Sequence, residues 1–136
     1  MSYPLEVKDN KFSGIGLICD KVTPANRIYP KSVIEKALIE FQKKIDQNNA
    51  FLVTSEFDPF KGIDINVITG IITSVSLCGN EVVISGRLLD VEKSKNFNNR
   101  TIKIYSAGYG NCDIDHINHV VTMQDDFELE CFIIEE

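Results

Sequence analysis

Several features that would assign this 136-residue chain to a membrane, secreted or nucleic-acid-binding class are absent from its sequence. It has no run of about 18 consecutive apolar residues, so we expect no membrane-spanning helix. Its first residues lack a basic segment followed by an apolar one, so we expect no secretory signal peptide. The formal net charge of -6 argues against a basic surface that could neutralise phosphates, and we expect no nucleic-acid partner.

The cysteines also lack the short spacings that are typical of redox and zinc motifs. Cys19, Cys78, Cys112 and Cys131 lie far apart, and none forms a C-x-x-C pair. This pattern favours reduced thiols in a cytoplasm over a disulfide framework. Hydrophobic residues make up 43% of the chain, which excludes a largely disordered protein and allows a core without disulfides.

Two long segments have clear hydrophobic patterns. Residues 67–77 and 82–89 are apolar or alternating, and Cys78-Gly79-Asn80-Glu81 between them has the composition of a tight turn. These residues are predicted to form a β-hairpin. In Ser32–Gln47 the apolar residues recur every three or four positions. This spacing predicts an amphipathic helix that packs through Val33, Leu38, Phe41 and Ile45.

Shorter segments complete the predicted fold. Residues 1–10 are polar and are predicted to be a loose N-terminal arm, whereas residues 11–136 form a single domain. Residues 106–110 are expected to turn, and residues 111–119 to be polar and irregular. Further strands are predicted at Phe12–Cys19, Phe51–Thr54, Thr101–Tyr105, Val120–Met123 and Phe127–Ile134. We therefore predict an α+β fold, mainly antiparallel β, with a barrel of about seven strands and at least one packed amphipathic helix.

Four segments, in this order along the chain, resemble the prohead proteases of tailed phages. Asn26–Pro30 (NRIYP) precedes the predicted helix, and Ser55–Pro59 (SEFDP) follows a strand. Ile71–Asp90 is the predicted hairpin, and Phe127–Phe132 (FELECF) opens the last strand. The resemblance runs from about Phe12 to the last residue. It implies a fold shared with the herpesvirus assemblin proteases and a role in phage head assembly.

The resemblance also implies catalytic residues, and here the sequence departs from the family. The family serine stands before a glycine on a strand, and Ser106 in Tyr105-Ser106-Ala107-Gly108 matches that place. The family histidine stands between the Asp and Pro of the turn, but Asp58 is followed directly by Pro59. A serine hydroxyl needs a nearby base to become a nucleophile. The chain therefore resembles a catalytically degenerate member.

Three groups of residues remain as alternatives for chemistry. His116 and His119 follow Ser106 by ten and thirteen residues, and either one could return to activate it in a serine endopeptidase. Cys112, His116 and His119 form a C-x3-H-x2-H series that is a weak zinc candidate, because structural zinc sites usually need four ligands. Glu56 and Asp58 are more typical of solvated or capping turn acids than of paired catalytic carboxylates.

These patterns lead to one functional expectation and two alternatives. We expect a capsid-associated phage protein in the virion or the host cytoplasm. It would lack a cofactor and act by binding other virion proteins, with self-association as one possibility. The first alternative is an active serine maturation protease that uses Ser106 with His116 or His119. The second is an unrelated cytosolic binding domain with a similar strand order.

Overall fold

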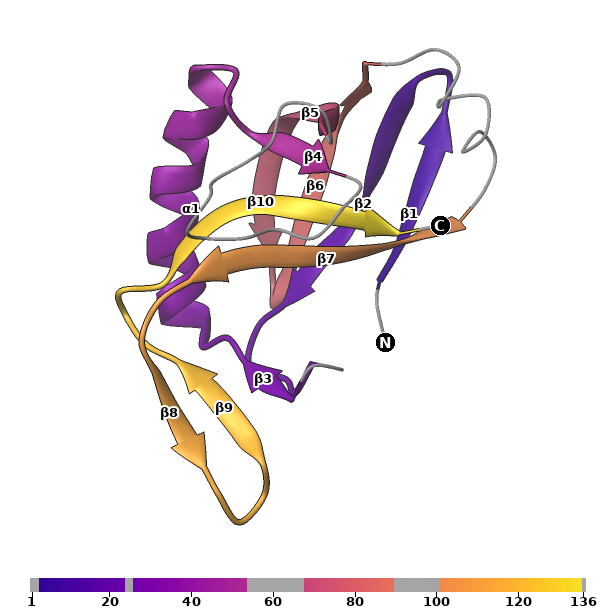
Figure 1. Cartoon of the computed structure of the whole chain (residues 1–136). Coiled ribbons are helices and arrows are strands. Elements are labelled where there is room, and N and C mark those ends of the chain that lie inside the picture. Colours follow the sequence, from indigo (N-terminus) through magenta and orange to yellow (C-terminus); the bar gives the residue numbers. More distant parts are fainter. Residues whose placement is uncertain (1–2, 24–25, 54–67, 90–100, 136) are drawn as a thin grey trace.

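The computed structural model describes residues 3–23, 26–53, 68–89 and 101–135. Seven strands form one closed sheet, in which each strand hydrogen-bonds to the next and β1 also pairs with β7 (Figure 1). Neighbours are antiparallel except β4 and β10, which are parallel. The order is β1 (Tyr3–Lys8), β2 (Lys11–Ile18), β6 (Glu81–Leu88), β5 (Ile68–Cys78), β4 (Phe51–Val53), β10 (Glu128–Glu135) and β7 (Thr101–Tyr109).

The predicted hairpin, with strands at 67–77 and 82–89, is confirmed as β5 and β6 over the described residues 68–89. These strands pair from Cys78 opposite Glu81 to Gly70 opposite Leu88, with one irregularity between Ile72 and Ser74. Gly79 in the turn has a φ of 62°, a conformation that costs a glycine little because it has no Cβ. Alternation in β6 buries Val82, Ile84 and Leu88 toward the core.

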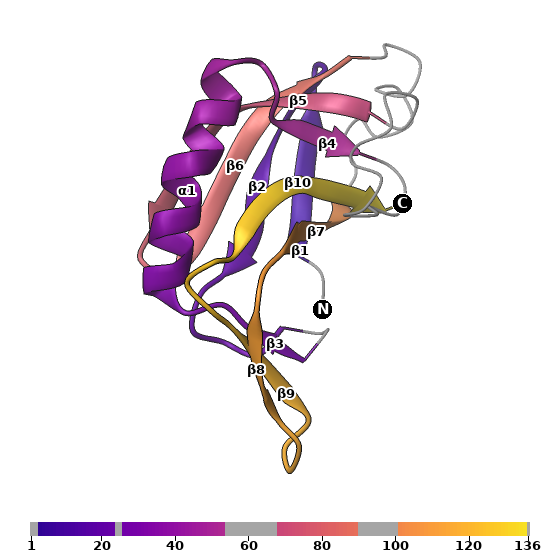
Figure 2. The ribbon, with the colours of Figure 1, turned by 60° about the vertical axis from the view of Figure 1, so that its left-hand side comes forward.

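The predicted helix is confirmed as α1 (Lys31–Asp46), which begins and ends one residue earlier than the pattern indicated. Pro30 is its N-cap residue, where a missing N–H is harmless. One face of α1 is buried through Val33, Ile34, Ala37, Phe41 and Ile45. Phe41 is fully buried and meets Phe132 of β10 edge to face, with ring centroids 5.8 Å apart. Figures 1 and 2 show α1 beside the sheet, close to β5 and β10.

A second, three-stranded sheet lies at one end of the molecule. Its order is β3 (Arg27–Ile28), β9 (Val120–Met123) and β8 (Cys112–Asp115), so β8 is an edge strand. Strands β8 and β9 form a hairpin that points away from the larger sheet in both Figure 1 and Figure 2. The α+β class, the predominance of antiparallel pairs and the packed helix are therefore as predicted.

Three parts of the prediction were wrong in detail. Residues 3–8 are strand β1, paired with both β2 and β7, and not a loose arm. Asp9 and Asn10 join β1 to β2 with φ values of 53° and 65°, which is the backbone of a two-residue type I′ hairpin turn. Strand β7 continues through the predicted turn to Tyr109, and the segment expected to be irregular contains β8. No helix in these described ranges is long and apolar enough to cross a bilayer.

Candidate functional site

Ser106 lies within β7, and the structure describes its backbone. It pairs with Phe132 of β10, and Phe132 in turn pairs with Leu52 of β4. Neighbouring strands lie about 4.8 Å apart, so the backbones of Ser106 and Leu52 are separated by roughly 10 Å across β10. Strand β4 ends at Val53, one residue short of the stretch that carries Glu56, Asp58 and Pro59. Those three residues, and with them the turn of the resembled motif, lie outside the described residues.

The two histidines of the chain lie together in another place. His116 and His119 are exposed in the turn between β8 and β9, where Asp115 pairs with Val120. The four residues of β8 alone carry this turn roughly 13 Å from the start of the hairpin. A general base must come within about 3 Å of the proton that it abstracts. With the hairpin pointing away from the larger sheet, the backbone does not bring either histidine to the strand that holds Ser106 (Figure 1).

The hairpin turn is held by a carboxylate and not by the histidines. Asp115 Oδ1 accepts hydrogen bonds from the backbone N–H groups of Ile117 and Asn118, at 3.0 and 3.1 Å. Asp115 Oδ2 accepts a third bond from the side-chain amide of Asn118, at 2.8 Å. These donors favour the ionised form, so they lower the pKa of Asp115, the side-chain amide having the largest effect. Sequence reasoning missed this role, although the Asp115-to-Asn118 spacing is a signal for such a turn.

The weak zinc candidate is not assembled. Cys112 is exposed at the base of the hairpin, opposite Met123, whereas His116 and His119 lie at its far end. Across the part of the chain that the structure describes, no group of three or more His, Cys, Asp or Glu residues is placed to hold a metal ion. Zinc ligands must converge at about 2.0–2.3 Å from one point, which residues at opposite ends of a hairpin cannot do.

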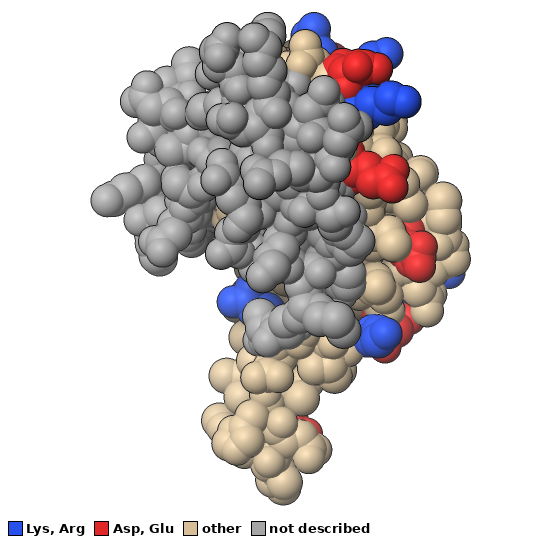
Figure 3. Space-filling model, turned by 90° about the vertical axis from the view of Figure 1, so that its right-hand side faces the viewer, with Lys and Arg blue, Asp and Glu red and all other residues tan. Residues whose placement is uncertain are grey.

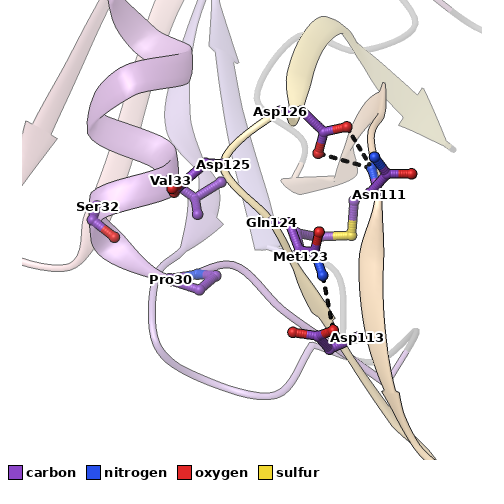
Figure 4. A pocket seen from close by; sticks show the side chains of 9 residues that line it. All are labelled: Pro30, Ser32, Val33, Asn111, Asp113, Met123, Gln124, Asp125 and Asp126. Carbon is purple, nitrogen blue, oxygen red and sulfur yellow. Dashed lines mark hydrogen bonds between the residues drawn. The ribbon is translucent and has the colours of Figure 1, made fainter.

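An open hollow of about 550 Å³ lies between the start of α1 and the base of the hairpin (Figure 4). Among its lining residues are the acids Asp113, Asp125 and Asp126. Asp126 accepts the backbone N–H of Asn111 with both carboxylate oxygens, at 2.9 and 3.1 Å, and Asp113 accepts the amide of Gln124 at 2.8 Å. Two of the three carboxylates therefore brace the hairpin.

Comparison with known proteins gives an informative structural likeness. No family model and no curated protein matches this chain. The solved structure of the bacteriophage T4 capsid assembly protease, gp21, superposes with a TM-score of 0.79 at 20% sequence identity. The match covers 93% of this chain and 81% of that one. The chain therefore has the fold of a phage capsid assembly protease, as the resemblance to prohead proteases implied.

Proposed function

We propose that this chain is a capsid-associated protein of a tailed phage that has the prohead-protease fold, has lost catalysis and acts by binding other virion proteins. The likeness to the T4 capsid assembly protease over 93% of the chain supports the phage and capsid part of the proposal. On this proposal the protein works in the virion or in the cytoplasm of the host cell, and it uses no cofactor.

The observation that carries the loss of catalysis is the placement of the two histidines. Both lie in the β8–β9 turn, whereas Ser106, which matches the family serine, lies in β7. Residues 54–67, which come after β4 in the sequence, contain no histidine, and Asp58 and Pro59 are adjacent. A serine without a base keeps only the acceleration from binding and oxyanion contacts, roughly 10³–10⁴-fold over water. That is too little to process the many subunits of a shell during assembly.

The test is the number of copies in purified virions of the phage that encodes this chain. Quantitative mass spectrometry would compare peptides of this protein with peptides of the shell subunit in the same sample. We expect a fixed, stoichiometric ratio, because a binding protein of the shell remains on it. The resemblance implies that a maturation protease is largely lost from the finished head. Loss of this protein between immature and mature heads would therefore contradict the proposal.

A further inference from the structure

The β8–β9 hairpin has an apolar face that is only half covered. Cys112 pairs with Met123 and Ile114 with Val121, so these four side chains share one face of the strand pair. Met123 is buried and Val121 packs against the core, so the β9 side of this face is covered, whereas Cys112 on β8 is exposed. Also on β8, Ile114 is 56% exposed, and Ile117 in the turn that follows is 87% exposed.

The exposed isoleucines are held in a fixed frame. Asp115 makes three hydrogen bonds across the turn that contains Ile117. At the base, Asp126 Oδ1 accepts a hydrogen bond from the backbone N–H of Asn111 at 2.9 Å. The backbone N–H of Gln124 donates to the carbonyl of Asn111 at 3.0 Å, and both distances are typical of good hydrogen bonds. These bonds fix the backbone that carries Ile114 and Ile117. A pre-ordered apolar tip lowers the entropy cost of binding a partner.

The charge of the surrounding chain indicates the chemistry of that partner. All 14 lysines and arginines lie within residues 1–103, together with 12 of the 20 acidic residues, which gives this part a formal charge of +2. Residues 104–136 hold the other eight acidic residues and no basic one, which gives -8. Four of these acids lie in the hairpin or at its base, namely Asp113, Asp115, Asp125 and Asp126, and the exposed Arg27 of β3 is the basic residue of the same small sheet. Figure 3 shows the hairpin as the lowest part of the molecule, mostly uncharged in this view, below a body with mixed charges. An apolar tip on an acidic segment matches an apolar depression with a basic border.

We propose that the β8–β9 hairpin is the docking element of this protein, and that Ile114 and Ile117 enter an apolar pocket bordered by Lys and Arg side chains on the phage head. This inference rests on the proposed function, and it adds the contacting residues and the chemistry of the partner surface. The isoleucines supply the buried anchor, and the acidic residues of this segment orient the approach.

A second copy of the chain is a less suitable occupant. Strand β8 is an edge strand, and such edges can pair with one another. Antiparallel pairing of two β8 strands about Ile114 would place Asp113 opposite Asp115 twice, and like charges directly opposite each other are destabilising. The acidic segment therefore favours a basic partner over its own copy.

The test is co-sedimentation of the purified protein with empty heads of the phage that encodes it. Ile117→Asp should weaken binding at least about tenfold, as loss of a central apolar anchor does. Ile39→Asp is the matched control, since Ile39 is 64% exposed but lies on α1. It should bind as the wild type does. Circular dichroism should show both variants folded, because both positions face solvent. Raising the ionic strength from about 0.05 to about 0.5 M should also weaken wild-type binding, since exposed charges are screened.

The results distinguish a failure of the docking proposal from a failure of the proposed function. If the wild type does not bind heads, the proposed function fails and the docking element fails with it. If the wild type binds and Ile117→Asp binds within twofold of it, the hairpin is not the docking element, and the proposed function stands. Binding that does not weaken with salt would overturn the basic border. Self-association of the wild type that Ile117→Asp abolishes, measured by sedimentation without heads, would identify a second copy as the occupant and overturn the proposed partner.

Discussion

Replacement of Phe41 by alanine should remove a large part of the stability of this fold. Phe41 is 0% exposed and joins α1 to the larger sheet through its contact with Phe132, at an interplanar angle of 86°. Substitution of a buried phenylalanine by alanine costs about 3–5 kcal/mol. An edge-to-face aromatic pair contributes about 0.5–1.5 kcal/mol of that loss beyond the buried area. Domains of this size have about 5–15 kcal/mol in total, so the variant should be close to unfolding.

Urea unfolding followed by far-UV circular dichroism measures this loss without relying on tryptophan, which the chain lacks. Ile39→Ala is the control on the same helix, since Ile39 is exposed and should change the free energy of unfolding by no more than about 0.5 kcal/mol. A double-mutant cycle with Phe132→Leu and Phe41→Leu should give a coupling of about 0.5–1.5 kcal/mol. If Phe41→Ala is as stable as Ile39→Ala, α1 does not pack on the sheet through this ring and the description of the core is wrong.

Two further predictions concern the sheet and the thiols. Gly86→Ala should destabilise the fold by several kcal/mol in the same urea assay, because an added Cβ would overlap backbone atoms of β5. If this variant is as stable as the wild type, β5 and β6 do not approach each other closely at Gly86. With a thiol reagent near pH 8, exposed Cys78 and Cys112 should react in the folded protein. Burial, the largest cause, raises the pKa of Cys19 to about 11 and that of Cys131 to about 12, so these two thiols should react only after unfolding. Because the folded state keeps these protons to higher pH than the unfolded state, stability should fall as the pH rises above about 9.

The long periodic segments could be predicted from the sequence because their patterns are local. The apolar stripe of Ser32–Gln47 and the paired runs at 67–77 and 82–89 each indicate one element over many residues, and α1 and the β5–β6 hairpin follow them closely. Strand β1 was missed because Pro4 and several polar residues weaken its pattern. Its pairing with both β2 and β7 is a tertiary property. The Asp9-Asn10 pair was nevertheless a usable signal for the turn that follows it.

The candidate site was less accessible to sequence reasoning. The order of β7, β10 and β4, which places Ser106 two strands from Leu52, depends on pairing between distant segments. His116 and His119 follow Ser106 by ten and thirteen positions, which is far enough for the chain to fold a histidine back toward the serine. In the structure the β8–β9 hairpin points away from the larger sheet (Figure 1), and β9 pairs with β3 there. Strand β8 is exposed at every position, so no buried face marks it in the sequence.

The loss of catalysis is tested most directly by labelling the folded protein with a fluorophosphonate, which reacts with activated serines. We predict that Ser106 remains unlabelled and that Ser106→Ala binds phage heads as the wild type does, because the backbone places neither histidine beside β7. Labelling that disappears in Ser106→Ala, and also in His116→Ala or His119→Ala, would contradict this account and identify the chain as an active maturation protease.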